Sequence, residues 1–195
     1  MKKNFLISIL YTLATTLLLG ILYPLAITGL AQVFFPRQAN GELITAGEKL
    51  VGSHLIGQPF TAPGYFYSRP SAAGSAGYDP TASSGSNLGP TNKALIDRVN
   101  VSVQQFQPTN PNTPIPADLV TTSGSGLDPD ISPASADFQV PRVAHERRMS
   151  EEEVRAFIAK HKKTRQFGLL GEPRVNVLDL NLDLDAKHRD RKSVV

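Results

Sequence analysis

The sequence predicts an α+β protein, with a single N-terminal transmembrane helix followed by one compact extracytoplasmic α+β domain. No Asp, Glu, Lys or Arg occurs between Lys3 and Arg37, which leaves an uncharged interval of 33 residues. Beyond this interval, helical and strand-like patterns alternate with turns rich in glycine and proline. We expect a transmembrane anchor over residues 1–36, the α+β domain over 37–184 and a disordered charged tail over 185–195.

The apolar interval is long enough to cross a bilayer. Residues 5–25 alone would form a helix of roughly 32 Å, against a hydrocarbon core of about 30 Å. We expect Pro24 to bend or end the regular part of this helix. The alternative is a cleaved signal peptide, but its apolar region is usually only about 7–15 residues long. The length therefore favours a retained anchor.

Small residues form a stripe along this helix. Every fourth position is small or is proline, at Ser8, Thr12, Thr16, Gly20 and Pro24. Small side chains let a second membrane helix approach closely. We therefore expect a partner helix against Ser8, Thr12, Thr16 and Gly20, although small residues are common in membrane helices and the spacing could arise by chance.

The orientation follows from the charges that flank the apolar interval. Lys2 and Lys3 precede it, and basic residues favour the cytoplasmic side. The N-terminus is therefore expected in the cytoplasm and the domain outside it. The chain contains no cysteine, so disulfides and cysteine zinc sites are excluded. Its net charge of +3 is small for 195 residues, and nothing in its distribution indicates nucleic-acid binding.

The domain combines helical and strand patterns. We expect helices over 92–106, over 134–147 with an interruption near Pro141, and from the capping box at Ser150 and Glu153 to about 162. Strands are expected over 65–67, 119–122 and 175–184, the last because leucines alternate with polar residues. Residues 71–86 are mostly Ala, Gly, Ser and Pro, which is typical of a flexible loop.

Residues 121–136, TTSGSGLDPDISPASA, have the densest turn chemistry in the chain. Gly124 and Gly126 allow positive φ, and Asp128 precedes a proline that fixes a turn. Ser132 followed by proline is typical of a helix start. We interpret Gly124, Gly126 and Asp128 as residues of a structural turn.

No catalytic or metal-binding motif accompanies this turn. The glycines lack the Gly-Lys-Ser/Thr of a phosphate loop, and no Gly-x-Ser-x-Gly elbow occurs. The histidines are not at metal-ligand spacing, and we expect neither a metal site nor a catalytic residue. Gln139 and Arg142 are the polar residues that could bind a phosphate or carboxylate. The alternative is that they satisfy backbone groups around the glycine turn.

Six ordered motifs carry a resemblance to a known family. They are GSHLIGQPF (52–60), YFYSRPSA (65–72), SNLGPTN (86–92), PADLVTTSGSGLDPDISPASA (116–136), FQVPRVA (138–144) and GEPRVNVLDLNL (171–182). Together they resemble the C subunit of Kdp-type potassium-transporting ATPases. The resemblance runs from the apolar helix to about Leu184. It also implies that residues 71–86, which by themselves are typical of a flexible loop, pack on a partner.

This resemblance implies an accessory, non-enzymatic subunit of a high-affinity, ATP-driven potassium uptake complex in the bacterial inner membrane. The implied partners are a channel-like potassium-binding subunit, an ATP-hydrolysing P-type subunit and a small membrane peptide. The implied role is to stabilise assembly and, as a catalytic chaperone, to raise the ATP affinity of the hydrolysing subunit. Potassium would be transported by the complex and not bound here.

The implied link to ATP conflicts with the expected orientation, because the domain would lie on the side without ATP. If this chain contacts ATP at all, Gln139 and Arg142 are the expected residues, and otherwise the effect is indirect. The alternative function is a membrane-anchored extracytoplasmic hydrolase that uses the SGSGLD turn.

Overall fold

The structure, a computed structural model, describes residues 2–46 and 48–193. The chain divides into two compact units, Met1–Val51 and Gly52–Val195. The expected domain boundary after residue 36 therefore lies inside the first unit. Helices and short strands both occur, as the α+β prediction requires.

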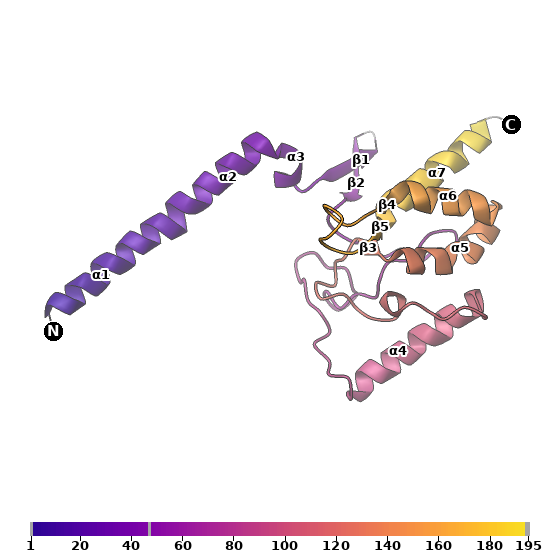
Figure 1. Cartoon of the computed structure of the whole chain (residues 1–195), viewed down its shortest axis with the longest axis horizontal. Helices are drawn as coiled ribbons and strands as arrows, with labels where there is room; N and C mark the ends of the chain where they lie inside the picture. Colours follow the sequence, from indigo (N-terminus) through magenta and orange to yellow (C-terminus); the bar gives the residue numbers. More distant parts are fainter. Residues whose placement is uncertain (1, 47, 194–195) are drawn as a thin grey trace. The chain divides into compact units, whose positions relative to one another are not determined.

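The first unit is dominated by one continuous helix (Figure 1). It comprises α1 (Lys2–Leu17), a π-helical turn (Leu18–Leu22) and α2 (Tyr23–Phe34). The resulting helix of 33 residues is long and apolar enough to cross a membrane. Its length is about 50 Å at 1.5 Å per residue, and none of its residues is buried within the chain.

Pro24 was expected to bend or end the regular part of this helix; it does not end the helix, but the regular α-helical hydrogen bonding is interrupted just before it. The π turn lies immediately before it, and Tyr23 donates its backbone N–H to the carbonyl of Leu18, five residues earlier. A proline lacks an N–H and crowds the carbonyl four residues before it, which here belongs to Gly20. The wider π turn accommodates this mismatch, and the helix continues to Phe34.

The rest of the first unit is short. Its elements are α3 (Pro36–Ala39), β1 (Leu43–Ala46) and β2 (Lys49–Ser53), the last of which runs into the second unit. β1 and β2 pair as a two-stranded sheet.

The helices of the second unit are α4 (Lys93–Phe106), α5 (Pro133–Arg147), α6 (Glu151–His161) and α7 (Val177–Ser193). Of these, α5, α6 and α7 pack against a small antiparallel sheet, and α4 lies apart from that sheet (Figure 1). Two 3₁₀ turns follow α4, at Gln107–Thr109 and Ala117–Leu119. The strands are β3 (Asp130–Ile131), β4 (Lys162–Lys163) and β5 (Arg174–Asn176), in the order β3-β5-β4. Ile131 and Lys162 both pair with Val175.

Two hydrophobic clusters hold this unit together. The larger joins α5, α6, α7 and the sheet, and contains Phe66, Ile131, Ala136, Val140, Val143, Ala144, Val154, Ile158, Val175, Val177, Leu180 and Leu184. The smaller contains Phe106, Leu119, Val120 and Phe138 and holds the C-terminal end of α4. The rings of Phe106 and Phe138 meet edge to face at 6.4 Å.

The predicted helices are confirmed, together with the start signals at Ser132 and Ser150. The side chains of Asn92, Ser132 and Ser150 cap α4, α5 and α6, and Ser150 and Glu153 form the expected capping box. The cap at Asn92 was not predicted. Pro141, however, does not interrupt α5. Val140 and Val143 are fully buried on either side of it, so packing keeps the two halves of the helix in line.

None of the three predicted strands forms as expected: residues 65–67 and 119–122 form no strand, and 175–184 are a strand only at their start. Residues 175–184 form only the end of β5 and then the first turns of α7. Val177, Leu180 and Leu184 are buried at helical spacing, so two of the four alternating leucines lie on one buried face of a helix. Residues 119–122 begin with the last residue of a 3₁₀ turn, the buried Leu119, and form no strand. α7 also continues to Ser193, into the segment that was expected to be disordered.

Candidate functional site

Residues 65–67 were expected to form a strand, but side-chain amides bind their backbone instead of a neighbouring strand. Asn181 accepts from the N–H of Phe66 (2.9 Å) and donates to its carbonyl (3.0 Å). Gln139 does the same for Tyr67, at 2.8 and 3.2 Å. An amide offers one acceptor and two donors, so each pair replaces the bonds of a strand partner. We call Gln139 and Asn181 the amide clamp.

The amide clamp is enclosed by protein. Gln139 is 0% exposed and Asn181 is 1% exposed. Gln139 also donates to the carbonyl of Ser135. In this conformation its amide is occupied by the chain itself, and a ligand could reach it only after residues 63–67 moved away.

Arg142 extends this bonding network on the next turn of α5. Its guanidinium donates to the carbonyls of Pro63 and Tyr65 and to Oε1 of Gln139 at 2.7 Å. It also stacks over the ring of Tyr67, 3.9 Å from the centroid. Burial lowers the pKa of Arg142. The carbonyl oxygens that accept its hydrogen bonds therefore replace the hydration that the charged guanidinium loses on burial.

Arg147 anchors the same segment from the last turn of α5. It donates to the carbonyl of Gly64 and to Asp185 at 2.9 Å, and it lies over the ring of Tyr65. The hydroxyl of Tyr65 donates to the other oxygen of Asp185 at 2.9 Å. Burial, together with the hydrogen bond and charge of Asp185, raises the pKa of Tyr65. Asp185 thus belongs to the folded domain, one residue beyond its predicted end.

Gln139 and Arg142 were predicted either to bind an anion or to satisfy backbone groups of the glycine turn. The structure brings them together, but against residues 63–67 and not against that turn. Asn181 and Asp185 were missed by the sequence analysis. Asn181 was read as the polar face of a strand, and no local pattern links it to a partner 115 residues away.

The glycine turn itself depends on one of its two glycines. Gly126 has φ of +67°, and a Cβ there would lie 2.6 Å from the carbonyl oxygen of Ser84 and 2.7 Å from the amide nitrogen of Ala73. Gly124 does not have positive φ, and no heavy atom would lie within 4 Å of its Cβ. The expectation of positive φ therefore holds for Gly126 and is wrong for Gly124.

The neighbours of Gly126 come from the segment that was expected to be a flexible loop. The hydroxyl of Ser71 donates to the carbonyl of Gly126 at 2.6 Å, and the N–H of Ser84 donates to the carbonyl of Ser125 at 2.9 Å. Ala73 is fully buried. Residues 71–86 are thus docked on the glycine turn of the same chain.

Asp128 forms a turn and an ion pair. One of its oxygens accepts from the N–H of Asp130 at 3.0 Å, and the other lies 3.1 Å from Arg69. Asp130 pairs with Arg174 at 2.9 Å, and burial raises the pKa of Asp130. Across the part of the chain that the structure describes, no group of three or more His, Asp or Glu residues could hold a metal ion.

The small-residue stripe lies on the exposed apolar helix. The hydroxyl of Ser8 donates to the carbonyl of Asn4 at 2.9 Å, so its polar group is satisfied within the helix. A shallow hollow is lined by Phe5, Ser8, Ile9, Thr12 and Leu13. A Cβ at Gly20 would meet only Thr16, at 3.8 Å. The stripe therefore has space for a close neighbour.

A long exposed apolar helix and a compact domain with an internally bonded polar network define an α+β protein whose N-terminal helix is long and apolar enough to cross a membrane. A family model described as "K+-transporting ATPase, c chain" matches residues 5–186. The chain therefore belongs to the KdpC family of potassium-transporting ATPase subunits.

Relatives from several bacteria agree with this assignment. The chain is 60% identical to the potassium-transporting ATPase KdpC subunit of Koribacter versatilis over 95% of both chains. It is 55% identical to that of Rhodopseudomonas palustris, over 95% of this chain and 99% of the relative. Identity to the KdpC subunit of Burkholderia mallei is 56%, over 76% of this chain and 78% of the relative.

Proposed function

We propose that this chain is an accessory, non-catalytic subunit of a high-affinity, ATP-driven potassium uptake complex in the bacterial inner membrane. The observation that carries the proposal is the helix Lys2–Phe34, which is long and apolar enough to cross a membrane and has no cover within the chain. The relatives of this chain are named as subunits of a potassium-transporting ATPase, which supports the same proposal. The subunit would stabilise the assembled complex.

The partners we propose are a channel-like potassium-binding subunit, an ATP-hydrolysing P-type subunit and a small membrane peptide. The stripe of Ser8, Thr12, Thr16 and Gly20 would meet a helix of one of them, because it lets two backbones approach closely in lipid. Potassium itself would pass through the complex without a site in this chain.

The topology we propose has the N-terminus in the cytoplasm and the domain outside, because Lys2 and Lys3 precede the span. A reporter that is active only outside the cytoplasm, fused after Val195, is expected to be active. The fusion point avoids the buried part of α7. The same reporter fused before Met1 is the control and should be inactive. The reverse pattern would contradict the proposed orientation.

We further propose that this subunit raises the ATP affinity of the hydrolysing subunit indirectly, by bracing the complex. Gln139 and Arg142 already bond to residues 63–67, which supports a structural role for them. The purified full-length chain should bind ATP no more tightly than the millimolar range, or about −4 kcal/mol.

The same two residues allow a test in the whole complex. For Gln139→Ala and Arg142→Ala we expect less assembled complex, while the apparent Michaelis constant for ATP of the assembled fraction stays unchanged. Normal assembly with a raised constant would instead show that these side chains contact nucleotide. Micromolar ATP binding by the isolated chain, abolished by Gln139→Ala, would lead to the same conclusion.

A further inference from the structure

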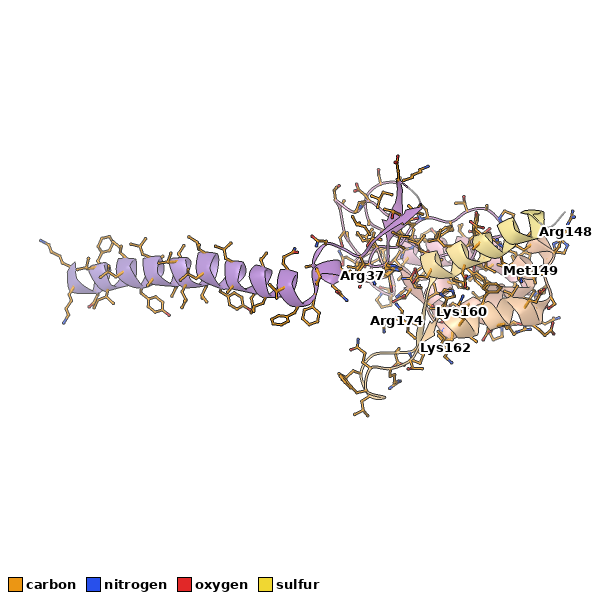
Figure 2. All side chains as sticks on the ribbon, turned by 90° about the horizontal axis from the view of Figure 1, so that it is seen from above. Arg37, Arg148, Met149, Lys160, Lys162 and Arg174 are labelled. Atoms are coloured by element: carbon orange, nitrogen blue, oxygen red, sulfur yellow. The ribbon has the colours of Figure 1, made fainter. Side chains whose placement is uncertain are left out.

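The hairpin between β4 and β5 ends in three exposed apolar side chains. Phe167 is 92% exposed, Leu169 is 79% exposed and Leu170 is 59% exposed. Figure 2 shows this segment, between Lys162 and Arg174, extending away from the rest of the second unit. Such a cluster at the tip of a protruding hairpin marks a contact outside the chain. We call residues 166–170 the apolar tip.

The apolar tip is an ordered turn. The backbones of Gln166 and Leu170 exchange two hydrogen bonds of 2.9 Å, and Arg165 pairs with Glu172 at the base of the hairpin. Phe167 has φ of +53° and Gly168 has φ of +75°. Positive φ is unfavourable for a bulky side chain, and Asn or Gly would suit the turn better. The local fold therefore gives no reason for a phenylalanine here.

Basic residues flank the apolar tip. Lys162, Lys163 and Arg165 are all exposed. Arg165 pairs with Glu172, the charge of Lys163 acts on Asp130, and Lys162 has no ion-pair partner among the side chains that the structure describes. Exposed apolar residues beside exposed lysines are typical of segments that lie in a membrane interface. Protein interfaces, in contrast, are depleted of lysine at their centres.

We propose that the apolar tip inserts into the interfacial region of the bilayer, with Lys162 and Lys163 against anionic lipid headgroups. Phe167, Leu169 and Leu170 would enter the boundary between headgroups and acyl chains, and the lysines would remain at headgroup level. The inference depends on the proposed membrane anchor, because an anchored domain meets the bilayer at high effective concentration. The tip would thereby give the domain a second attachment to the membrane.

The chain offers a direct probe because it contains no tryptophan. The full-length Phe167→Trp variant would be reconstituted into vesicles of phosphatidylcholine and phosphatidylglycerol, with and without bromine on the acyl chains. A tip buried about 5–10 Å into the headgroup boundary should show blue-shifted emission that is quenched by bromine near that boundary. Val101→Trp is the control, because Val101 is 64% exposed on α4 and should stay unquenched.

The role of charge is tested in the same background. Replacing Lys162 and Lys163 by glutamate should reduce the quenching roughly twofold or more, because each lysine is attracted to anionic lipid. Arg148→Glu is the matched control, since Arg148 lies far from the hairpin (Figure 2). Circular dichroism should show the same helix content in all variants.

Two results would overturn the inference. Water-like, unquenched emission from the anchored Phe167→Trp variant would show that the tip does not enter lipid. Emission that becomes shielded only when the other subunits are present would assign the tip to a protein surface. Flotation of the protein with the vesicles after an alkaline wash tests the anchor separately, so failure of the anchor is distinguished from failure of the tip.

Discussion

The apolar helix Lys2–Phe34 and helix α5 both carry polar residues at regular spacing, but these residues meet different surroundings. On α5, Gln139 is fully buried and its amide bonds to Tyr67. On the apolar helix, Ser8 is exposed, and its hydroxyl bonds only to the preceding turn. The difference teaches that a polar residue on a helix supports the tertiary fold when its partner lies in a distant segment of the chain, and not in the helix itself.

This comparison separates two kinds of experiment. Substitutions on α5 should change the free energy of unfolding, because they leave buried backbone groups without partners. Substitutions on the stripe should leave folding unchanged and affect only the association with other helices. The following predictions run from the largest to the smallest expected change in unfolding free energy.

Gln139→Ala is expected to have the largest effect. It would leave the N–H and carbonyl of Tyr67 buried without partners and remove an acceptor from Arg142. We expect a loss of roughly 3–5 kcal/mol of unfolding free energy, measured by chemical denaturation of the full-length protein in detergent. Asp137→Ala, on the exposed side of the same helix, should change it by less than about 0.5 kcal/mol. Equal effects would disprove the structural role of Gln139.

Gly126→Ala should cause the second-largest loss of unfolding free energy. Its Cβ would lie within 3 Å of backbone atoms of Ser84 and Ala73, at a φ that disfavours alanine. We expect a loss of about 2–4 kcal/mol from strain and displacement. Gly124→Ala is the matched control, because its Cβ would point into open space and the change should be near zero. If both variants have the same unfolding free energy in this experiment, the close packing at Gly126 does not contribute measurably to stability.

Asp183 should contribute a smaller, pH-dependent effect. Hydrogen bonds from Lys160 (2.7 Å) and His161 (2.9 Å) lower the pKa of Asp183 below its usual 3.8. A lowered pKa in the folded state stabilises the fold above pH 3.8, and this stabilisation is lost as the pH falls through the folded pKa.

Asp183→Asn tests this link between α6 and α7. At neutral pH it should lower the unfolding free energy by up to about 1 kcal/mol, as expected for a solvent-accessible pair. The difference from the unmodified protein should disappear in acid, below the folded pKa. Asp97→Asn, which removes the exposed pair with Lys93, should have a smaller effect of about 0.3–0.5 kcal/mol. A difference that persists at low pH would show that charge is not the cause.

Gly20→Leu should have the smallest effect on unfolding of the domain and the clearest effect on assembly. The added side chain meets only Thr16 of its own helix, but it would fill the space of a neighbouring helix. We expect fewer partner subunits to co-purify, while the unfolding free energy changes by less than about 0.5 kcal/mol. Leu18→Phe adds bulk off the stripe and should assemble normally. Equal assembly of both variants would mean that the stripe has no role.

The sequence predicted those parts of the fold that depend on near neighbours. The caps of Ser132 and Ser150 bond within three residues of themselves. The helix Lys2–Phe34, long and apolar enough to cross a membrane, satisfies its own backbone, and its apolar composition is visible without any knowledge of the fold. These features were recognisable because their physical cause lies within a single segment.

The tertiary structure decided the features whose partners are distant in sequence. Residues 65–67 look like a strand, but Gln139 and Asn181, 72 and 115 residues away, supply the bonds of a neighbouring strand. Gly124 and Gly126 are equivalent by local sequence, but Ala73 and Ser84 pack against Gly126 and not against Gly124. The alternating leucines of 178–184 fit a strand or a helix, and packing of α7 against α5 and α6 selected the helix. In each case local propensity is weak, and burial with satisfied hydrogen bonds determines the outcome.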